Sequence, residues 1–276
     1  MKKKKLLTIC GDVIGMAACL VIFVTPFLYM LVNSLKGTKE ANLMSLSLPE
    51  EIHLENYLEV IKANNYMLVT EFKNSLILAL CSVILLILTG SMAGYVLQRR
   101  NDRTTRLANV LIMSGLMVPP AILPTIWVLQ GLHLYKTLLG MTIVEVALNI
   151  PFTIMLYRGF MATIPTELEE AGFIDGCSRI QLFSRVVFPL LKPVTSTVII
   201  LNAVSIFNDF TNPLYFLPGN ANATVQLTLY NFKGKYASSY NLLFADVLVI
   251  TIPMLVLFIF FNKRIIDGMV AGAVKG

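Results

Sequence analysis

The stretch IPTELEEAGFIDGCSRIQLFSRVVFPLLKP, residues 164–193, is a polar segment between two strongly apolar ones. The whole chain is only 14% charged, yet the first half of this stretch holds four carboxylates, at Glu167, Glu169, Glu170 and Asp175. Charged side chains are costly inside a bilayer. The stretch therefore lies outside the hydrocarbon, while the apolar segments on both sides of it can enter.

Three local patterns predict the secondary structure of this stretch. Thr166-x-x-Glu169 is a capping box, in which each side chain bonds a free backbone N–H at the start of a helix. Asp175-Gly176 is a turn signal, because glycine can adopt a positive φ. Ser178-x-x-Gln181 is a second capping box, which opens a helix that continues to Pro189. The prediction is helix, turn, helix.

The first predicted helix has a surface that another protein could approach closely. Leu168, Ala171 and Gly172 fall on one face by their spacing, and two of the three are small. A solvated loop that merely tolerates charge is the alternative. From the residues alone, both interpretations stay open.

The composition identifies a membrane protein. The chain has 276 residues, is 56% hydrophobic and has a mean hydropathy of +0.73. Apolar runs of roughly 20 residues can cross the bilayer as helices. Six are expected, at residues 13–35, 75–97, 107–130, 138–157, 194–217 and 242–261. The opening MKKKK precedes an apolar run too long for a cleaved signal peptide, so the first run is expected to be an uncleaved span.

Lysine and arginine are distributed unequally between the two sides of this layout. Fifteen of the 22 fall on the side of the N-terminus and seven on the other, at positions 36, 39, 62, 73, 136, 233 and 235. The positive-inside rule places both termini, the 98–106 loop and the 158–193 loop in the cytoplasm. The net charge of +6 then reflects topology, and no nucleic-acid partner is expected.

Prolines and glycines predict breaks and close contacts in the spans. Pro119, Pro120 and Pro124 must interrupt the helical hydrogen bonds of the third span. Gly90-x-x-x-Gly94 permits close approach of another helix to the second span.

The sequence shows no catalytic constellation. The two histidines, His53 and His133, lie near no nucleophile motif, and the four cysteines lack metal-ligand spacing. We therefore expect no catalytic residue, metal site or bound cofactor. If ATP and Mg²⁺ drive the protein, another chain hydrolyses the ATP.

The 164–193 stretch resembles the EAA signature of permease subunits of bacterial carbohydrate ABC importers of the maltose type. The resemblance rests on Glu170-Ala171-Gly172, Asp175-Gly176 and Phe188-Pro189, and it extends to ENY at 55–57, NSL at 74–76 and AGAVKG at 271–276. Gly172 and Phe188 depart from the usual alanine and leucine.

This resemblance implies a type I importer permease fold: one all-α transmembrane domain over 1–276 with a cytoplasmic coupling helix in the 158–193 loop. It implies a bacterial cell-membrane protein that imports a sugar with a second permease subunit, two ATPase subunits and an extracytoplasmic solute-binding protein. The residues implied in ATPase coupling are Glu167, Leu168, Glu170, Ala171, Gly172, Asp175 and Gly176.

The fifth span carries a polar stripe that predicts a substrate pathway. At 100° per residue Asn202, Ser205, Asp209 and Asn212 fall within an arc of about 80°, and Asn208 widens it to about 120°. Tyr215 projects close to Asn208 and Asn212 on the same helical wheel. Hydroxyl-binding groups beside a flat aromatic face suit a sugar. The stripe consists of Asn202, Ser205, Asn208, Asp209, Asn212 and Tyr215. Hydrogen bonding between helices is the alternative for any single member.

An ion-coupled secondary transporter is the alternative of a different class. Glu145 in the fourth span and Asp246 in the sixth could relay protons, as intramembrane carboxylates do in such proteins. Asn149, one helical turn after Glu145, offers that carboxylate a local partner instead.

Overall fold

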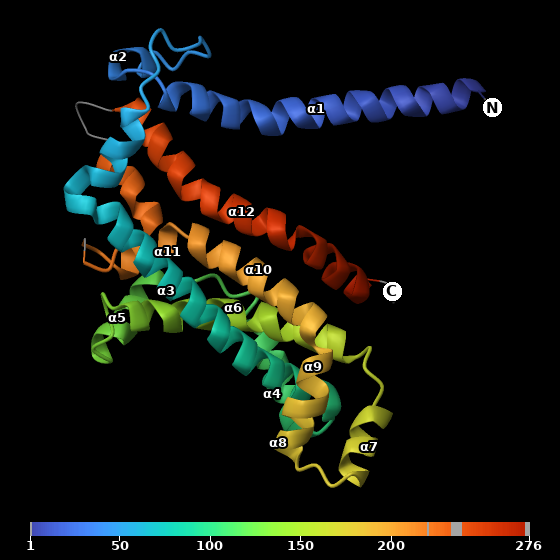
Figure 1. The fold of residues 1–276 in the computed structure, drawn as a ribbon. Coiled ribbons are helices and arrows are strands. Elements are labelled where there is room, and N and C mark those ends of the chain that lie inside the picture. The colour runs from blue at the N-terminus through green and yellow to red at the C-terminus, as the bar shows by residue number, and fades with distance from the viewer. Residues whose placement is uncertain (1, 220, 233–238, 274–276) are drawn as a thin grey trace. The chain divides into compact units, whose positions relative to one another are not determined.

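The computed structural model describes residues 2–219, 221–232 and 239–273, with side chains left out at 2–11, 14, 231, 232, 257, 258 and 260–273. Within these ranges every regular element is a helix, which agrees with the all-α prediction (Figure 1). The elements are α1 Lys2–Ser34, α2 Thr38–Ala41, α3 Glu55–Arg99, α4 Arg103–Ser114, α5 Ile122–Gly131, α6 Leu138–Met161, α7 Glu167–Ile174, α8 Arg179–Leu182, the π-helix η1 Phe183–Val187, α9 Phe188–Leu190, α10 Lys192–Asn208, α11 Thr211–Phe216, the 3-10 helix η2 Val225–Phe232 and α12 Tyr240–Ala273.

Three of the described helices are long and apolar enough to cross a bilayer: the Gly15–Ser34 part of α1, α3 and α6. A fourth crossing results if Arg179–Leu190 and Lys192–Asn208, bent by 75°, form one span. The remaining predicted spans contain shorter apolar helices, Ile122–Gly131 and Tyr240–Val256. The side chains at 257, 258, 260 and 261, at the end of the sixth predicted span, lie outside the described part. The count of six crossings stays a prediction.

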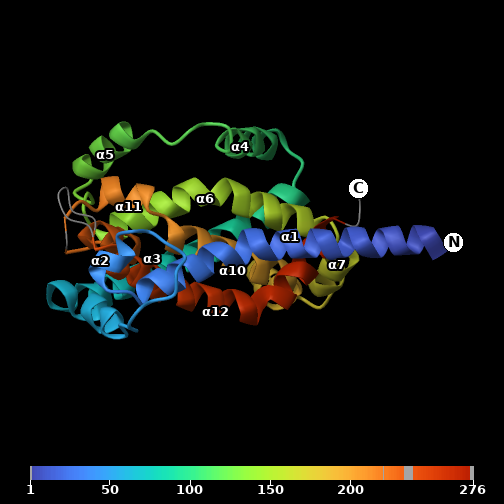
Figure 2. The ribbon, with the colours of Figure 1, turned by 90° about the horizontal axis from the view of Figure 1, so that it is seen from above.

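The third predicted span, 107–130, is two helices rather than one. α4 ends at Ser114 and α5 begins at Ile122, and the stretch between them holds Pro119 and Pro120. Proline lacks the N–H that would continue the helix and clashes with the preceding turn. The expected interruption is confirmed, and it separates two helices joined by a loop, with α4 seen end on in Figure 2.

Contacts within the chain define two compact units. The first comprises residues 1–70 and 227–253, and the second comprises 71–226 and 254–276. Within α3, Asn64, Asn65 and Tyr66 have φ values of 48°, 59° and 60°, so the helix is broken there. The prediction of one transmembrane domain over 1–276 stays a prediction.

The first unit is organised around buried polar side chains. Asn56, from the ENY motif, donates to the Ser34 and Lys36 carbonyls at 2.8 and 2.9 Å and accepts from Asn241 at 2.9 Å. The Lys36 side chain is fully buried, and its Nζ donates to the Ser45 carbonyl at 2.9 Å. These bonds join the end of α1, the start of α3 and the start of α12.

In the second unit, α3 and α6 approach closely at two glycines. A Cβ at Gly90 would lie 2.6 Å from Thr153 Cγ2, and one at Gly94 would lie 2.8 Å from Tyr157 Cβ and 3.2 Å from the Arg158 backbone nitrogen. No larger residue fits without a shift of the neighbouring helix. The close approach predicted from Gly90-x-x-x-Gly94 is confirmed, and it occurs within this chain.

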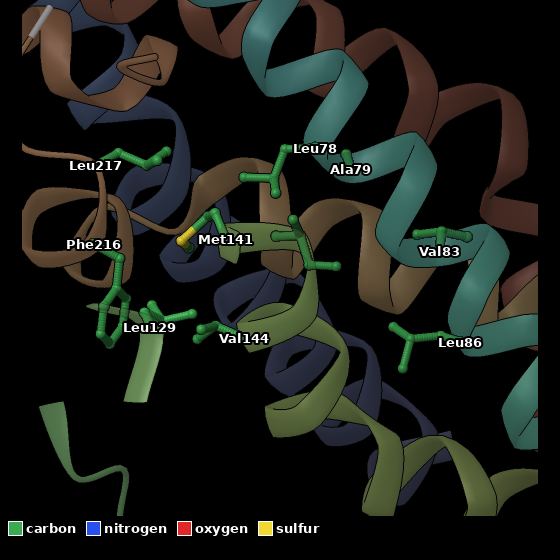
Figure 3. Packing of buried hydrophobic residues seen from close by; sticks show 10 residues of the cluster. Leu78, Ala79, Val83, Leu86, Leu129, Met141, Val144, Phe216 and Leu217 are labelled. Carbon is green, nitrogen blue, oxygen red and sulfur yellow. The ribbon is translucent and has the colours of Figure 1, made fainter. Parts of the chain in front are cut away.

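An apolar cluster in the second unit fixes the relative positions of α3, α5, α6, α10 and α11. The labelled side chains of α3, α5, α6 and the α11 region gather in one place (Figure 3), and Ile206 of α10 belongs to the same cluster. At one edge, Asn74 donates to the Ala223 carbonyl at 3.0 Å and the Val225 N–H donates to Ser75 Oγ at 2.9 Å. The buried members of the cluster are Leu78, Ala79, Val83, Leu86, Leu129, Met141, Val144, Ile206, Phe216 and Leu217.

Candidate functional site

The predicted helix, turn, helix is present over 167–190. α7 ends at Ile174, and Gly176 has a φ of +81°, which glycine adopts without strain. The Ser178 capping box is confirmed: Ser178 N–H donates to Gln181 Oε1 at 2.9 Å, and Gln181 N–H donates to Ser178 Oγ at 3.4 Å. α8 then continues through the π-helical η1 into α9.

The capping box predicted at Thr166 is wrong. The Thr166 side chain makes no capping bond, and Glu169 turns away from it. Glu169 Oε1 instead lies 2.6 Å from Arg99 Nε, and its Oε2 accepts from the Tyr95 hydroxyl at 2.9 Å. Arg99 also donates to the Ile164 carbonyl at 2.8 Å. A buried ion pair to the end of α3 is a stronger bond for a carboxylate than one backbone N–H.

Most of the predicted coupling residues lie on the exposed side of this segment. The exposed ones are Glu167, Leu168, Glu170, Ala171, Asp175 and Gly176. Gly172 does not share their surface, which corrects the prediction that it forms one face with Leu168 and Ala171. It is buried, and a Cβ there would lie 2.5 Å from Leu182 Cδ1. Its small size lets α7 pack onto α8.

A second polar anchor of this region was not predicted. At the end of α6, the Arg158 guanidinium donates to Gln98 Oε1 at 3.2 Å and to Asn109 Oδ1 at 2.5 Å. It therefore links α6 to α3 and α4. The sequence signal was an arginine directly after an apolar span, which also suits any positively charged loop.

The fifth predicted span, 194–217, is not one continuous helix. α10 ends at Asn208, Asp209 has an extended ψ of 121°, and α11 begins at Thr211. Asp209 accepts from the Thr211 and Asn212 N–H groups at 2.9 and 3.2 Å and from Asn212 Nδ2 at 2.6 Å. The side chain thus starts α11, as short polar side chains do at helix ends.

The break rearranges the predicted polar stripe. Ser205, Asn208 and Tyr215 are exposed, and Asp209 and Asn212 are half-buried. Asn202 does not join this face, which corrects the helical-wheel expectation.

Asn202 is buried within the packing of α10. Its Nδ2 donates to the Val198 carbonyl at 2.9 Å and to Thr153 Oγ1, on α6, at 3.4 Å. The geometry at this position is that of the interhelical hydrogen bond considered above as the alternative.

Glu145 is a further member of the polar cluster at the break. Its side chain is 2% exposed and contacts Asp209 and Asn212. Asn149 Nδ2 donates to the Glu145 carbonyl at 2.8 Å and to Oε2 at 3.2 Å, which confirms the local pairing. Asn208 lies at the same break and accepts from Gln226 Nε2 at 3.3 Å. Sequence reasoning found both Glu145 and the stripe but did not connect them.

The second carboxylate of the ion-coupled alternative, Asp246, lies in the first unit. It is fully buried and accepts from Thr228 Oγ1 at 2.7 Å. Among the residues whose side chains are described, no group of three or more His, Cys, Asp or Glu is arranged to hold a metal ion.

Comparison with known proteins identifies relatives over the whole length of the chain. Residues 86–270 match the family described as binding-protein-dependent transport system inner membrane component. The chain is 34% identical over 256 residues to the putative ABC transporter permease protein ORF2 of Caldicellulosiruptor sp. (strain Rt8B.4), with 91% of each chain covered. It is 32% identical over 278 residues to the melibiose/raffinose/stachyose import permease protein MelC of Bacillus subtilis (strain 168), covering 100% of this chain and 98% of the relative.

A solved structure shares the fold. It belongs to a bacterial ABC transporter involved in the import of the acidic polysaccharide alginate; the TM-score is 0.84 at 19% identity, with 95% of this chain and 98% of that chain covered. Together with the matched family and the two relatives above 30% identity, this similarity places the fold among type I ABC importer permeases. The chain belongs to the family of inner membrane components of binding-protein-dependent transport systems.

Proposed function

We propose that this chain is the permease subunit of an ATP-driven importer of a sugar or oligosaccharide in a bacterial cell membrane. The observation that carries the proposal is full-length similarity to a permease named for melibiose, raffinose and stachyose import. A second relative, the probable starch degradation products transport system permease protein AmyC of Thermoanaerobacterium thermosulfurigenes, is 29% identical over 99% of this chain and 97% of its own. In this role the chain catalyses nothing, and a separate subunit hydrolyses ATP.

The exposed side of α7 is the proposed contact for that ATPase. Glu170 and Glu167 present carboxylates, Leu168 and Ala171 present a small apolar surface, and the turn at Asp175-Gly176 completes it. Behind this surface the Arg99–Glu169 ion pair ties α7 to α3. A force on α7 is therefore transmitted to α3, which packs closely on α6 at Gly90 and Gly94. Because α6 carries Glu145 of the polar break, this connection meets the physical requirement for coupling.

The polar break between α10 and α11 is the proposed substrate pathway. Asn208, Asp209 and Asn212 supply hydrogen-bonding groups, Tyr215 supplies an exposed aromatic face, and Ser205 adds a hydroxyl one turn earlier. Sugars bind to such combinations because they expose hydroxyls around apolar C–H faces. Asn202 supports this pathway indirectly, through its hydrogen bond to Thr153 on α6.

The proposed partners follow from surfaces that one chain leaves uncovered. The Gly15–Ser34 part of α1 is apolar with a mean hydropathy of 2.2, and of its residues only Asn33 and Ser34 are buried within this chain. A second permease subunit and lipid would cover such a helix. Two ATPase subunits and an extracytoplasmic solute-binding protein complete the proposed importer, with both termini in the cytoplasm.

Transport in reconstituted vesicles tests the proposal. The complex is purified through a tag on this chain and supplied with its binding protein, ATP and a panel of labelled sugars. Uptake should require ATP inside and the binding protein outside, and it should persist when the proton gradient is collapsed. Uptake that follows the proton gradient and needs no ATPase would support the secondary-transporter alternative instead.

A further inference from the structure

A groove in the second unit lies between the end of α3 and the α7–α8 segment. Its volume is about 460 Å³. The lining combines an apolar floor with three arginines and contains no carboxylate among the described residues. The lining residues are Met92, Tyr95, Val96, Arg99, Arg100, Phe173, Arg179, Ile180 and Phe183.

The apolar floor continues along α3 as an exposed face. Leu85, Leu88, Met92 and Val96 are 38%, 52%, 56% and 40% exposed and recur every three or four residues. At 1.5 Å per residue the face is roughly 16 Å long, about half of the ~30 Å hydrocarbon thickness. This is the length that one acyl chain occupies in one leaflet.

The arginines at the end of this face are unequally neutralised. Arg99 is paired with Glu169 at 2.6 Å, and Arg100 lies 3.0 Å from Asp102. The Thr105 backbone N–H holds the pKa of the Asp102 carboxyl below its usual range, so this carboxylate stays charged beside Arg100. Within the described part of the chain, Arg179 makes no ion pair. The groove therefore has one excess positive charge above an apolar floor.

We propose that this groove binds one anionic phospholipid of the cytoplasmic leaflet. Its phosphate lies between Arg100 and Arg179, and one acyl chain lies along the α3 face. The assignment rests on the proposed function, because that function places this end of α3 at the cytoplasmic surface. Basic pockets at this level of membrane proteins suit anionic headgroups.

The geometry favours a lipid over a protein occupant. A cytosolic ATPase contacts groups outside the hydrocarbon, whereas Met92 and the α3 face before it belong to an apolar span. A transmembrane helix of the partner permease would cover the α3 face but would leave the excess charge of Arg179 without a counter-charge. A phospholipid covers the apolar face with its acyl chain and supplies the counter-charge for Arg179 with its phosphate. It would also bridge α3 to α8, close to the proposed ATPase contact.

Native mass spectrometry of the delipidated importer complex tests the site. The complex, purified through a tag on this chain, is titrated with phosphatidylglycerol or with phosphatidylcholine of the same acyl chains. Arg179→Gln and Arg100→Gln should each weaken binding of the most tightly held phosphatidylglycerol about fivefold, and the double variant about 25-fold. Arg185→Gln is the matched control: Arg185 is exposed on the same segment but does not line the groove, so binding should not change.

Two further measurements distinguish a bound phospholipid from inorganic phosphate and from a protein partner. Ile180→Asn, which adds a polar group without a charge, should weaken phosphatidylglycerol binding while leaving any binding of inorganic phosphate unchanged, because only the lipid uses the apolar floor. A cysteine at position 180, which keeps both arginines, in a variant lacking the native cysteines, should not cross-link to the partner permease or the ATPase. Equal binding of both lipids, equal loss in Arg185→Gln, insensitivity to Ile180→Asn, or efficient cross-linking would each overturn the site. Sugar uptake driven by ATP alongside any of these results would leave the proposed function intact.

Discussion

Arg99 Nε lies 2.6 Å from Glu169 Oε1, and this contact fastens the acidic helix α7 to the end of α3. Both side chains are largely buried, at 16% and 9% exposure, and Tyr95 and the Ile164 carbonyl complete the bonding. Glu169 therefore has a structural role, whereas its neighbour Glu170 remains exposed on the proposed docking surface.

Glu169→Gln should destabilise the protein. The substitution leaves the Arg99 charge buried without its counter-charge, which costs about 3 kcal/mol and roughly 6–12 °C in the unfolding midpoint. Thermal unfolding of the purified complex measures this. Arg185→Gln removes an exposed charge outside the groove and should give no resolvable shift, so equal effects of the two variants would contradict the structural role of Glu169.

Glu170→Lys should leave the chain folded and inserted but impair coupling. The reversed charge would repel basic or polar groups of the ATPase across a close interface. Sugar uptake and substrate-stimulated ATP hydrolysis are the measurements, with Glu51→Lys, an exposed carboxylate in the other unit, as the control. Normal uptake and normally stimulated hydrolysis in the Glu170 variant would exclude a coupling role.

Gly94→Ala should loosen the contact between α3 and α6. The new methyl would lie 2.8 Å from Tyr157 Cβ and 3.2 Å from a backbone nitrogen, so a helix must shift at a cost of about 1–3 kcal/mol. Gly159→Ala is the control, since no heavy atom of the surroundings lies within 4 Å of its Cβ position. The unfolding midpoint should fall for the first variant and stay level or rise for the second.

Asn208→Ala and Asn202→Ala should affect different properties, the first sugar transport and the second stability. Asn208 is exposed at the polar break, so its loss should lower uptake or shift sugar preference while assembly and basal ATP hydrolysis persist. Asn202 is buried against Thr153, so its loss should mainly lower thermal stability. Unchanged uptake with Asn208→Ala and Asp209→Ala would indicate that the polar stripe has a structural role and does not contact the sugar.

Cysteine labelling tests the orientation in the membrane. In a variant lacking the native cysteines, a single cysteine at position 230 should react with an impermeant reagent added outside intact cells, and one at position 176 should not. Tyr230 and Gly176 are both exposed, so burial within the chain does not decide the result. The reverse pattern would contradict the topology inferred from the lysines and arginines.

The acidic segment shows how far local patterns predict structure. The Ser178 capping box and the Gly176 turn depend on neighbours a few residues apart, and both formed as expected. The capping box at Thr166 failed because Glu169 found a partner 70 residues away in sequence. A local motif cannot anticipate a competing ion pair that only the tertiary fold supplies.

The polar stripe failed for a different reason. The helical wheel assumed a regular helix through residue 217, whereas Asp209 bonds the N–H groups of a new helix and breaks the periodicity. Short polar residues before a proline, here Asp209, Asn212 and Pro213, were the available signal for that break. Asn202 lies before the break, but its burial depends on α6 and could not be read from one helix.

The π-helical turn at Phe183–Val187 makes this part of the chain sensitive to its own length. A π-helix bonds residue i to i+5, so it accommodates one more residue than the same turn of α-helix. Deleting one residue there would remove the extra residue and restore α-helical bonding, so the faces of α9 and α10 would keep their orientation relative to α8. A further inserted residue would instead rotate everything that follows by about 100° relative to α8. A single deletion should therefore be tolerated within 183–187, whereas an insertion there should not.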